Sequence, residues 1–253
     1  MILYEYPFSE KIRSFLRLEY LFKRLSFFHQ NFAISPESDE SLLGALFDVM
    51  DVCERGDVRN TILQELDKQK NTLQEFRNYP DINLSAIDSA LIELNQVSRE
   101  LHDAGKIGRA ARESEWLSKI KSRYVVPGGL SSTEFPAYRG WLMGNQEQRQ
   151  EAVDQWVASF KPLSDAIEQL LHFIRASREP EYVTTTVNGV YERSLAGQPF
   201  QLIRVWVPES NGVYPEISAN KYVTFVRLYQ LSKQLDAHLV TKAIGFKIAF
   251  CNF

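Results

Sequence analysis

The segment from Glu10 to Phe28, EKIRSFLRLEYLFKRLSFF, places basic and aromatic side chains at a helical spacing. Arg13, Arg17, Tyr20 and Arg24 follow one another at i, i+4, i+7 and i+11. In an α-helix this spacing gathers the four side chains into a stripe about 60° wide, with apolar residues on both edges. Guanidinium groups bind carboxylates in a bidentate manner, and flanking apolar side chains add contact area. The stripe therefore predicts a binding site for a short acidic segment that also carries apolar anchors.

Five further basic residues are candidates for the same kind of site: Arg55, Arg112, Arg139, Lys221 and Arg227. Strand alternation would place Lys221 and Arg227 on the same side as Phe225. The competing interpretation is structural, with each arginine stem packed on apolar surface and its head paired with a nearby carboxylate. Three arginines without an interleaved acid would repel one another unless an anion neutralises them. That anion can come from another part of the chain or from a partner, and the sequence leaves both open.

The sequence contains no recognisable catalytic or metal-binding motif. The histidines have no partner at metal-ligand spacing, and two cysteines cannot complete a zinc site. The Gly128-Gly129 pair lacks the lysine and the glycine spacing of a phosphate-binding loop. No serine stands in a nucleophile elbow. We therefore expect a protein that is not an enzyme and that uses no cofactor and no metal.

Composition narrows the class of partner and the compartment. The 253 residues carry a net charge of −3, whereas a nucleic-acid-binding protein would normally be clearly basic. The charge is uneven, because residues 178–253 have a net charge of +2 and residues 1–177 one of −5. No apolar run approaches the roughly 20 residues needed to cross a bilayer. Two cysteines in apolar surroundings and the absence of a signal pattern indicate a cytosolic protein.

Hydrophobic periodicity divides the chain into a helical part and a β part. A period of 3.6 residues predicts helices over about 9–29, 39–54, 58–79, 83–103, 110–123, 138–142, 146–160 and 162–177. After residue 178 the period changes to two, and Asn188-Gly189 predicts a hairpin. The predicted fold class is α+β. An N-terminal all-α domain, residues 8–177, is followed by a small antiparallel β domain, residues 178–253, which residues 1–7 join as an added strand.

Several stretches, read in order, resemble the ZapD family of bacterial cell division proteins. They are EKIRSFLRLEYLF, DVCERGDVRNTILQELDKQ, KIGR followed by RE, the Pro-Gly-Gly loop and YPEIS, so the resemblance runs along nearly the whole chain. It implies a cytoplasmic homodimer at the mid-cell division ring. It also implies binding to the C-terminal tail of FtsZ, the tubulin-like filament protein of that ring, and bundling of the filaments. That tail is short, apolar and acid-containing, which matches the ligand predicted for the basic stripe.

The resemblance also bears on individual residues. Where this chain matches the family's basic positions, it implies tail binding by Arg17, Arg55 and Arg227. Arg139 stands where a relative can carry histidine, so its charge would not depend on pH near neutrality. Glu115 and Val223 stand where some relatives are basic. A pocket that used those two positions would be weaker in this chain or would lie elsewhere.

The basic stripe and the resemblance together predict that the protein is a non-enzymatic crosslinker of filaments. Each protomer of a homodimer would bind one FtsZ tail, so that the dimer joins two filaments and stabilises the division ring. The alternative is an enzyme or a binding module for an anionic small molecule in an arginine-rich pocket. An enzyme of that kind would need a convergent nucleophile or base, which the sequence does not supply. We expect no binding to nucleic acid and no insertion into a membrane.

Overall fold

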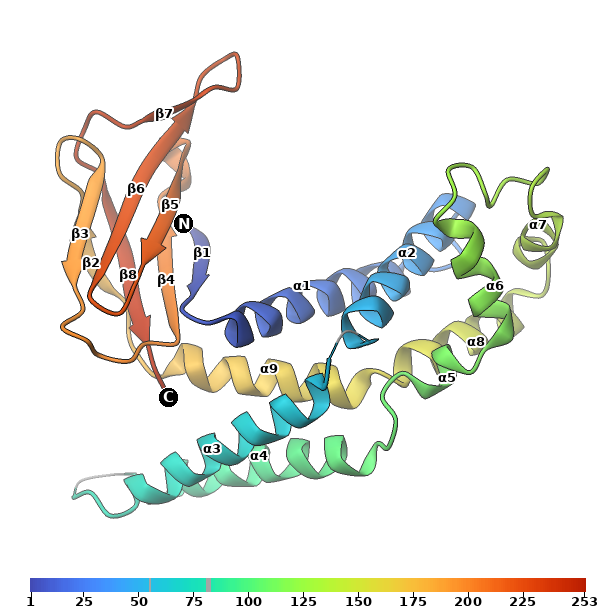
Figure 1. Ribbon diagram of the computed structural model, residues 1–253, viewed down its shortest axis with the longest axis horizontal. Coiled ribbons are helices and arrows are strands. Elements are labelled where there is room, and N and C mark those ends of the chain that lie inside the picture. The colour runs from blue at the N-terminus through green and yellow to red at the C-terminus, as the bar shows by residue number, and fades with distance from the viewer. Residues whose placement is uncertain (55, 81–82) are drawn as a thin grey trace. The chain divides into compact units, whose positions relative to one another are not determined.

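The computed structural model describes residues 1–54, 56–80 and 83–253, apart from the side chain of Asn211. Helices form the N-terminal part and antiparallel sheets the C-terminal part, and the first strand joins one of these sheets (Figure 1). The predicted α+β class is therefore confirmed. The sequence predicts this class because the hydrophobic period changes from 3.6 to two residues along the chain. The first period suits a helix and the second suits a strand.

The chain divides into two compact units. Residues 17–170 form one, which we call the helical unit. Residues 1–16 and 171–253 form the other, which we call the β unit. The domain boundary predicted near residue 177 stays a prediction.

The helices have the following bounds: α1 Glu10–Gln30, α2 Pro36–Glu54, α3 Val58–Phe76, α4 Leu84–Asp103, α5 Arg109–Arg112, α6 Glu115–Tyr124, α7 Pro136–Leu142, α8 Gln146–Ala158 and α9 Lys161–Ala176. Their apolar faces supply buried leucines and isoleucines to the core of the helical unit. None of the helices in the described ranges combines the length and the apolar character needed to cross a lipid bilayer.

Local hydrogen bonds explain where several helices begin. The Ser9 hydroxyl accepts the backbone N–H of Ile12 at 3.3 Å, so α1 starts where the sequence predicts. Asp57 and Asn83 cap α3 and α4 in the same way. The second helix begins three residues earlier than expected, at Pro36. Proline suits a first helical position, because its missing N–H would have no intrahelical partner there.

The prediction of one continuous helix over 110–123 is wrong. The structure has a single turn, α5, and then a separate helix, α6. The Ser114 side chain accepts the N–H of Leu117 at 3.2 Å and therefore caps a new helix. Serine competes with the helical hydrogen-bond ladder in this way, so a continuous apolar pattern does not ensure a continuous helix.

The β unit contains two antiparallel sheets. Its strands are β1 Ile2–Pro7, β2 Glu181–Thr184, β3 Val190–Ser194, β4 Leu202–Val207, β5 Val213–Ala219, β6 Val223–Leu231, β7 Ala237–Leu239 and β8 Gly245–Cys251, with a 3₁₀ turn, η1, at Glu209–Asn211. One sheet has the strand order β1-β4-β8-β2. The other has the order β3-β6-β5, and β7 pairs with β6. Buried residues of both sheets form one core: Leu195, Ile203, Val205, Val207, Val213, Val226, Leu228, Val240, Ile244, Phe246, Ile248 and Phe250.

The predicted hairpin at Asn188-Gly189 is wrong. The turn itself forms, because Thr186 N–H donates to the Val190 carbonyl at 2.8 Å and Gly189 adopts φ +69°. However, β2 pairs with β8, whereas β3 pairs with β6 in the other sheet. An Asn-Gly turn reverses the chain locally, but the choice of partner strand depends on nonlocal pairing.

An ion-pair network inside the β unit holds the first strand in place. Glu5 of β1 stands opposite Arg204 of β4, with 3.3 Å between the charged groups. Arg175 near the end of α9 donates to both carboxylate oxygens of Glu5, at 2.8 and 2.7 Å. Because these side chains are largely buried, the network favours the observed register of β1 over one shifted by a residue.

Candidate functional site

The basic stripe predicted on the first helix lies on α1, and its two edges differ. Leu18, Leu21 and Leu25 are buried, so one edge belongs to the core of the helical unit. Tyr20 within the stripe is 65% exposed, and Phe27 on the other edge is 61% exposed. We use the name α1 strip for the stripe residues of the helical unit together with this exposed edge residue: Arg17, Tyr20, Arg24 and Phe27.

Carboxylates accompany two of the three stripe arginines. Arg24 pairs with Asp48 of α2 at 2.6 Å. Arg13, which belongs to the β unit, pairs with Glu10 at 3.0 Å. Arg17 is exposed and has no ion pair or hydrogen bond from its side chain to any described residue. Of the two sources of anion that the sequence left open, the chain itself supplies a carboxylate to Arg13 and Arg24, and Arg17 keeps its charge available for a ligand.

Arg112 lines a second basic feature, a cavity of about 210 Å³ in the helical unit. Lys106 and Arg59 line the same cavity, and Asp57 is the acid among its lining residues. Arg59 donates to the carbonyl of Leu101 at 3.1 Å and so is held at the end of α4. The Nε of Arg112 is buried and has no hydrogen-bond partner in the described part of the chain. A buried donor without a partner is uncommon in folded proteins. We call this feature the Arg112 cavity.

Cys53 also lines the Arg112 cavity, but its thiol is not activated. Burial raises its pKa to about 11, although the positive charge of Arg112 acts in the opposite direction. The thiol therefore stays protonated at neutral pH, where a nucleophilic cysteine would need to be a thiolate. The cavity offers charge recognition and no nucleophile at this position.

Arg139 lies on α7 beside a cavity of about 330 Å³ that also contains Glu37 and Glu40. The two carboxylates outnumber the one guanidinium, so this cavity does not favour an anion. Arg55, another predicted site residue, lies outside the described residues. Glu115 is exposed in the first turn of α6, where a carboxylate is favourable near the helix N-terminus.

The remaining predicted site residues belong to the β unit. Arg227 of β6 lies over Phe225 at 5.3 Å from the ring centroid, and 3.9 Å separates it from the carboxylate of Glu216. Lys221 precedes the strand and lies over the exposed ring of Tyr222. The two cations therefore do not share a strand face as predicted, because β6 begins only at Val223.

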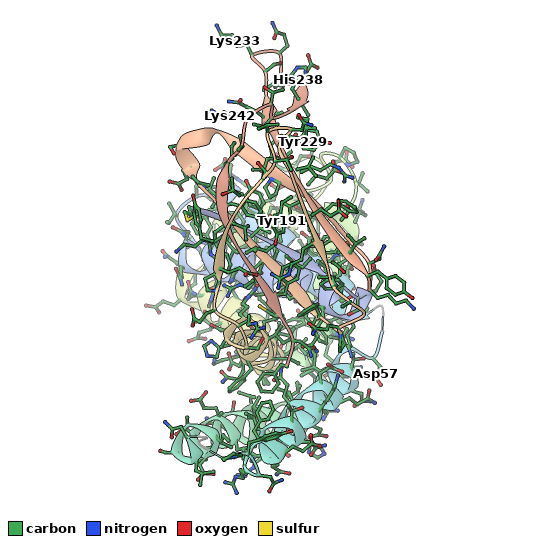
Figure 2. All side chains as sticks on the ribbon, turned by 90° about the vertical axis from the view of Figure 1, so that its left-hand side faces the viewer. Asp57, Tyr191, Tyr229, Lys233, His238 and Lys242 are labelled. Carbon is green, nitrogen blue, oxygen red and sulfur yellow. The ribbon has the colours of Figure 1, made fainter. Side chains whose placement is uncertain are left out.

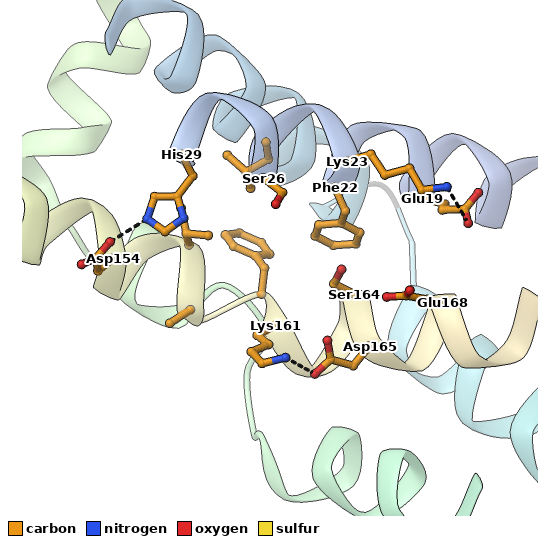
Figure 3. Close-up of a pocket in the computed structure, with 14 residues that line it drawn as sticks. Glu19, Phe22, Lys23, Ser26, His29, Asp154, Lys161, Ser164, Asp165 and Glu168 are labelled. Carbon is orange, nitrogen blue, oxygen red and sulfur yellow. Dashed lines mark hydrogen bonds and ion pairs between the residues drawn. The ribbon is translucent and has the colours of Figure 1, made fainter. Parts of the chain in front are cut away.

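Another cavity of the helical unit has the opposite charge preference. It has a volume of about 560 Å³ and lies between α1 and the helices α8 and α9, with Phe22 and Phe160 among its apolar residues (Figure 3). His29 bonds to Asp154 at 2.6 Å, which lowers the pKa of that carboxyl. Four carboxylates line the cavity against two lysines: Glu19, Asp154, Asp165 and Glu168 against Lys23 and Lys161. An acidic ligand would therefore be repelled from this cavity.

Among the described residues, no group of three or more His, Cys, Asp or Glu side chains is arranged so that it could bind a metal ion. The chemistry that the arrangement offers is recognition of carboxylates by arginine beside exposed aromatic rings. This matches the type of ligand predicted from the stripe.

Comparison with known proteins identifies the family of the chain. Residues 16–227 match the family model described as ZapD, cell division protein. The chain belongs to the ZapD family. It is 37% identical to the cell division protein ZapD of Bordetella petrii and 40% identical to that of Ralstonia pickettii, each over the full length of both chains. ZapD of Dechloromonas aromatica is 38% identical, also over the full length. Membership assigns the chain a role in cell division.

The ZapD match includes the whole α1 strip as well as Arg112, Arg139, Lys221 and Arg227, whereas Arg13 precedes it. Two residues of these surfaces, Phe27 and Lys106, are not among the site residues predicted from the sequence. Phe27 lies at an apolar edge of the predicted stripe, and its exposure depends on which side of α1 packs against the core. Lys106 precedes Arg112 in the sequence, and a cavity joins the two because the α4–α5 loop brings them together.

Proposed function

We propose that this ZapD-family protein is a non-enzymatic division factor that binds the C-terminal tail of FtsZ. As a homodimer in the cytoplasm, it crosslinks and bundles FtsZ filaments at the mid-cell ring. The observation that carries the proposal is the α1 strip, where unpaired Arg17 stands beside exposed Tyr20. A carboxylate of the tail would pair with Arg17, and an apolar tail residue would pack on Tyr20 and Phe27.

The other predicted residues would contribute to tail binding to different extents. Arg112 supplies a second positive position, because its Nε lacks a partner and Lys106 lies in the same cavity. Arg24 can share its charge between Asp48 and the tail. The remaining residues, which we propose as peripheral contacts, are Arg13, Arg55, Arg139, Lys221 and Arg227.

The expected affinity of one site is low. Exposed ion pairs contribute about 0–1 kcal/mol each, and an apolar anchor adds about 1.5–3 kcal/mol when it becomes buried. Ordering a flexible tail removes several kcal/mol, which leaves a dissociation constant in the micromolar range or weaker. Two such sites in a dimer would still bind a filament strongly, because a filament offers many tails.

Co-sedimentation with FtsZ polymers tests the proposal directly. We expect the protein to pellet with full-length FtsZ filaments and to stay in the supernatant with filaments that lack the tail. Added salt should weaken co-sedimentation without abolishing it, since salt screens the arginines but not the apolar anchors. Equal pelleting with both kinds of filament would contradict a tail-binding role.

Crosslinking requires two binding sites, so we also predict a homodimer. Sedimentation equilibrium at micromolar concentration should give about twice the monomer mass of 29.2 kDa. A monomer mass across the concentration range in which bundling occurs would exclude the dimeric crosslinker.

The Arg112 cavity favours a second candidate function, which is binding of an anionic small molecule. In that case Arg112→Gln would abolish binding of the anion, and Arg17→Glu would leave it unchanged. The tail-binding proposal expects the larger loss of FtsZ binding from Arg17→Glu.

A further inference from the structure

The hairpin formed by β6 and β7 exposes leucines to solvent. We call residues 231–242 the β6–β7 tip. β7 pairs only with the end of β6, so that Leu231 faces Ala237 and Leu239 faces Tyr229. By strand alternation Leu231 and Leu239 share one face of this two-stranded ribbon. Leu231 is 50% exposed, Leu235 is 75% exposed and Leu239 is 38% exposed.

Leu235 occupies a backbone conformation that leucine disfavours. Its φ is +68°, in the left-handed region that turns normally assign to glycine, asparagine or aspartate. Its N–H donates to the Ser232 carbonyl at 3.0 Å, and the Ser232 N–H donates to the Asp236 carbonyl at 2.9 Å. The Ser232 hydroxyl also accepts the N–H groups of Gln234 and Asp236 at 3.1 and 3.2 Å, so Ser232 closes the turn. Glycine would make the same turn with less strain. A strained and exposed leucine therefore points to a contact outside this chain.

Basic residues outnumber acidic residues in the β6–β7 tip. Lys233 and Lys242 lie around the projecting tip, and Asp236 is the acid within it (Figure 2). The chain has no arginine after Arg227, although arginine is the residue suited to bidentate contact with a carboxylate. Lysine is a hydrated point charge on a flexible apolar stem, and it can reach the headgroup level while the leucines go deeper. Residues 178–253 also carry a net charge of +2, in contrast to the acidic remainder.

We propose that the β6–β7 tip is a peripheral contact for an anionic lipid surface. Leu235, with Leu231 and Leu239, enters the boundary between headgroups and acyl chains, while Lys233 and Lys242 stay at the anionic headgroups. The contact is weak and reversible, because few apolar groups and two lysines take part. The proposal revises the expectation of no insertion into a membrane to a shallow contact that does not cross the bilayer. It is independent of the proposed binding to FtsZ.

Flotation with lipid vesicles tests the proposal on the full chain without FtsZ. We expect binding to vesicles of equal parts phosphatidylcholine and phosphatidylglycerol, and on the order of tenfold weaker binding to pure phosphatidylcholine. Leu235→Gly should reduce binding to the anionic vesicles by roughly tenfold, because one inserted leucine is lost. The same variant should melt at the same temperature as the wild type or higher, because glycine accepts the positive φ.

Two further variants make the result decisive. Leu235→Asn also suits left-handed backbone and should lose binding to the same extent as Leu235→Gly. Val187→Gly removes another apolar side chain of the β unit, which is 67% exposed, and should bind like the wild type. The proposal would be overturned if the wild-type protein did not bind to the anionic vesicles. It would also be overturned by Leu235 variants that bind vesicles normally but lose co-sedimentation with FtsZ, which would assign the tip to a protein partner.

Discussion

Replacing Arg17 with glutamate is expected to weaken binding of an FtsZ tail peptide by at least about tenfold and to abolish filament bundling. The substitution removes the one stripe arginine that has no partner among the described residues and places a carboxylate where the tail's acid would approach. Bundling is more sensitive than binding of a single tail, because crosslinking requires both sites of a dimer to be occupied. The thermal unfolding midpoint should hardly change, since Arg17 is exposed and a surface substitution usually changes stability by less than about 0.5 kcal/mol.

Arg123→Glu provides the matched control. Arg123 is an exposed arginine in the last turn of α6, outside the α1 strip, and its replacement changes the net charge by the same amount. Fluorescence anisotropy with a labelled tail peptide and light scattering of FtsZ filaments measure the two effects. If Arg123→Glu weakens both signals as much as Arg17→Glu does, overall charge and not the α1 strip governs the interaction. If Arg17→Glu unfolds the protein, Arg17 has a structural role instead.

Asp39→Ala is expected to destabilise the helical unit by roughly 3–5 kcal/mol, because it breaks a buried ion pair from one side. Asp39 is 2% exposed and accepts a hydrogen bond from Arg149 Nη1 at 2.7 Å. It also accepts the N–H of Ala33 at 2.7 Å, which holds the turn in which Ala33 adopts φ +62°. Removal of the carboxylate leaves a guanidinium buried between Phe32 and Trp141 without its counter-charge.

Urea denaturation followed by circular dichroism measures this loss. Glu113→Ala is the comparison, because it removes an exposed i,i+4 partner of Arg109 and should cost below about 1 kcal/mol. Asp39→Asn keeps an acceptor for Ala33 and should fall between the two. A loss below about 1 kcal/mol for Asp39→Ala would show that water reaches Arg149 and replaces the carboxylate.

Features that depend on near neighbours in the chain could be predicted from the sequence. The helices α1, α3 and α4 begin where Ser9, Asp57 and Asn83 can cap them, because a cap needs only the next three residues. The change from a period of 3.6 to a period of two separated the helical part from the sheets. The ordered stretches that resemble ZapD were also sufficient for the family, which the full-length relatives confirm.

The pairing of strands and the neutralisation of charges could not be predicted from the sequence, because both depend on nonlocal contacts. The arms of the Asn188-Gly189 turn enter different sheets, since each strand finds its partner far along the chain. Helical spacing placed Arg17 and Arg24 on one stripe, but Asp48, 24 residues after Arg24, neutralises only the second of them. The packing of Leu18, Leu21 and Leu25 likewise made one edge of α1 core and left Phe27 in solvent. The physical reason is that helix periodicity is a local property, whereas burial and ion pairing depend on residues that only folding brings together.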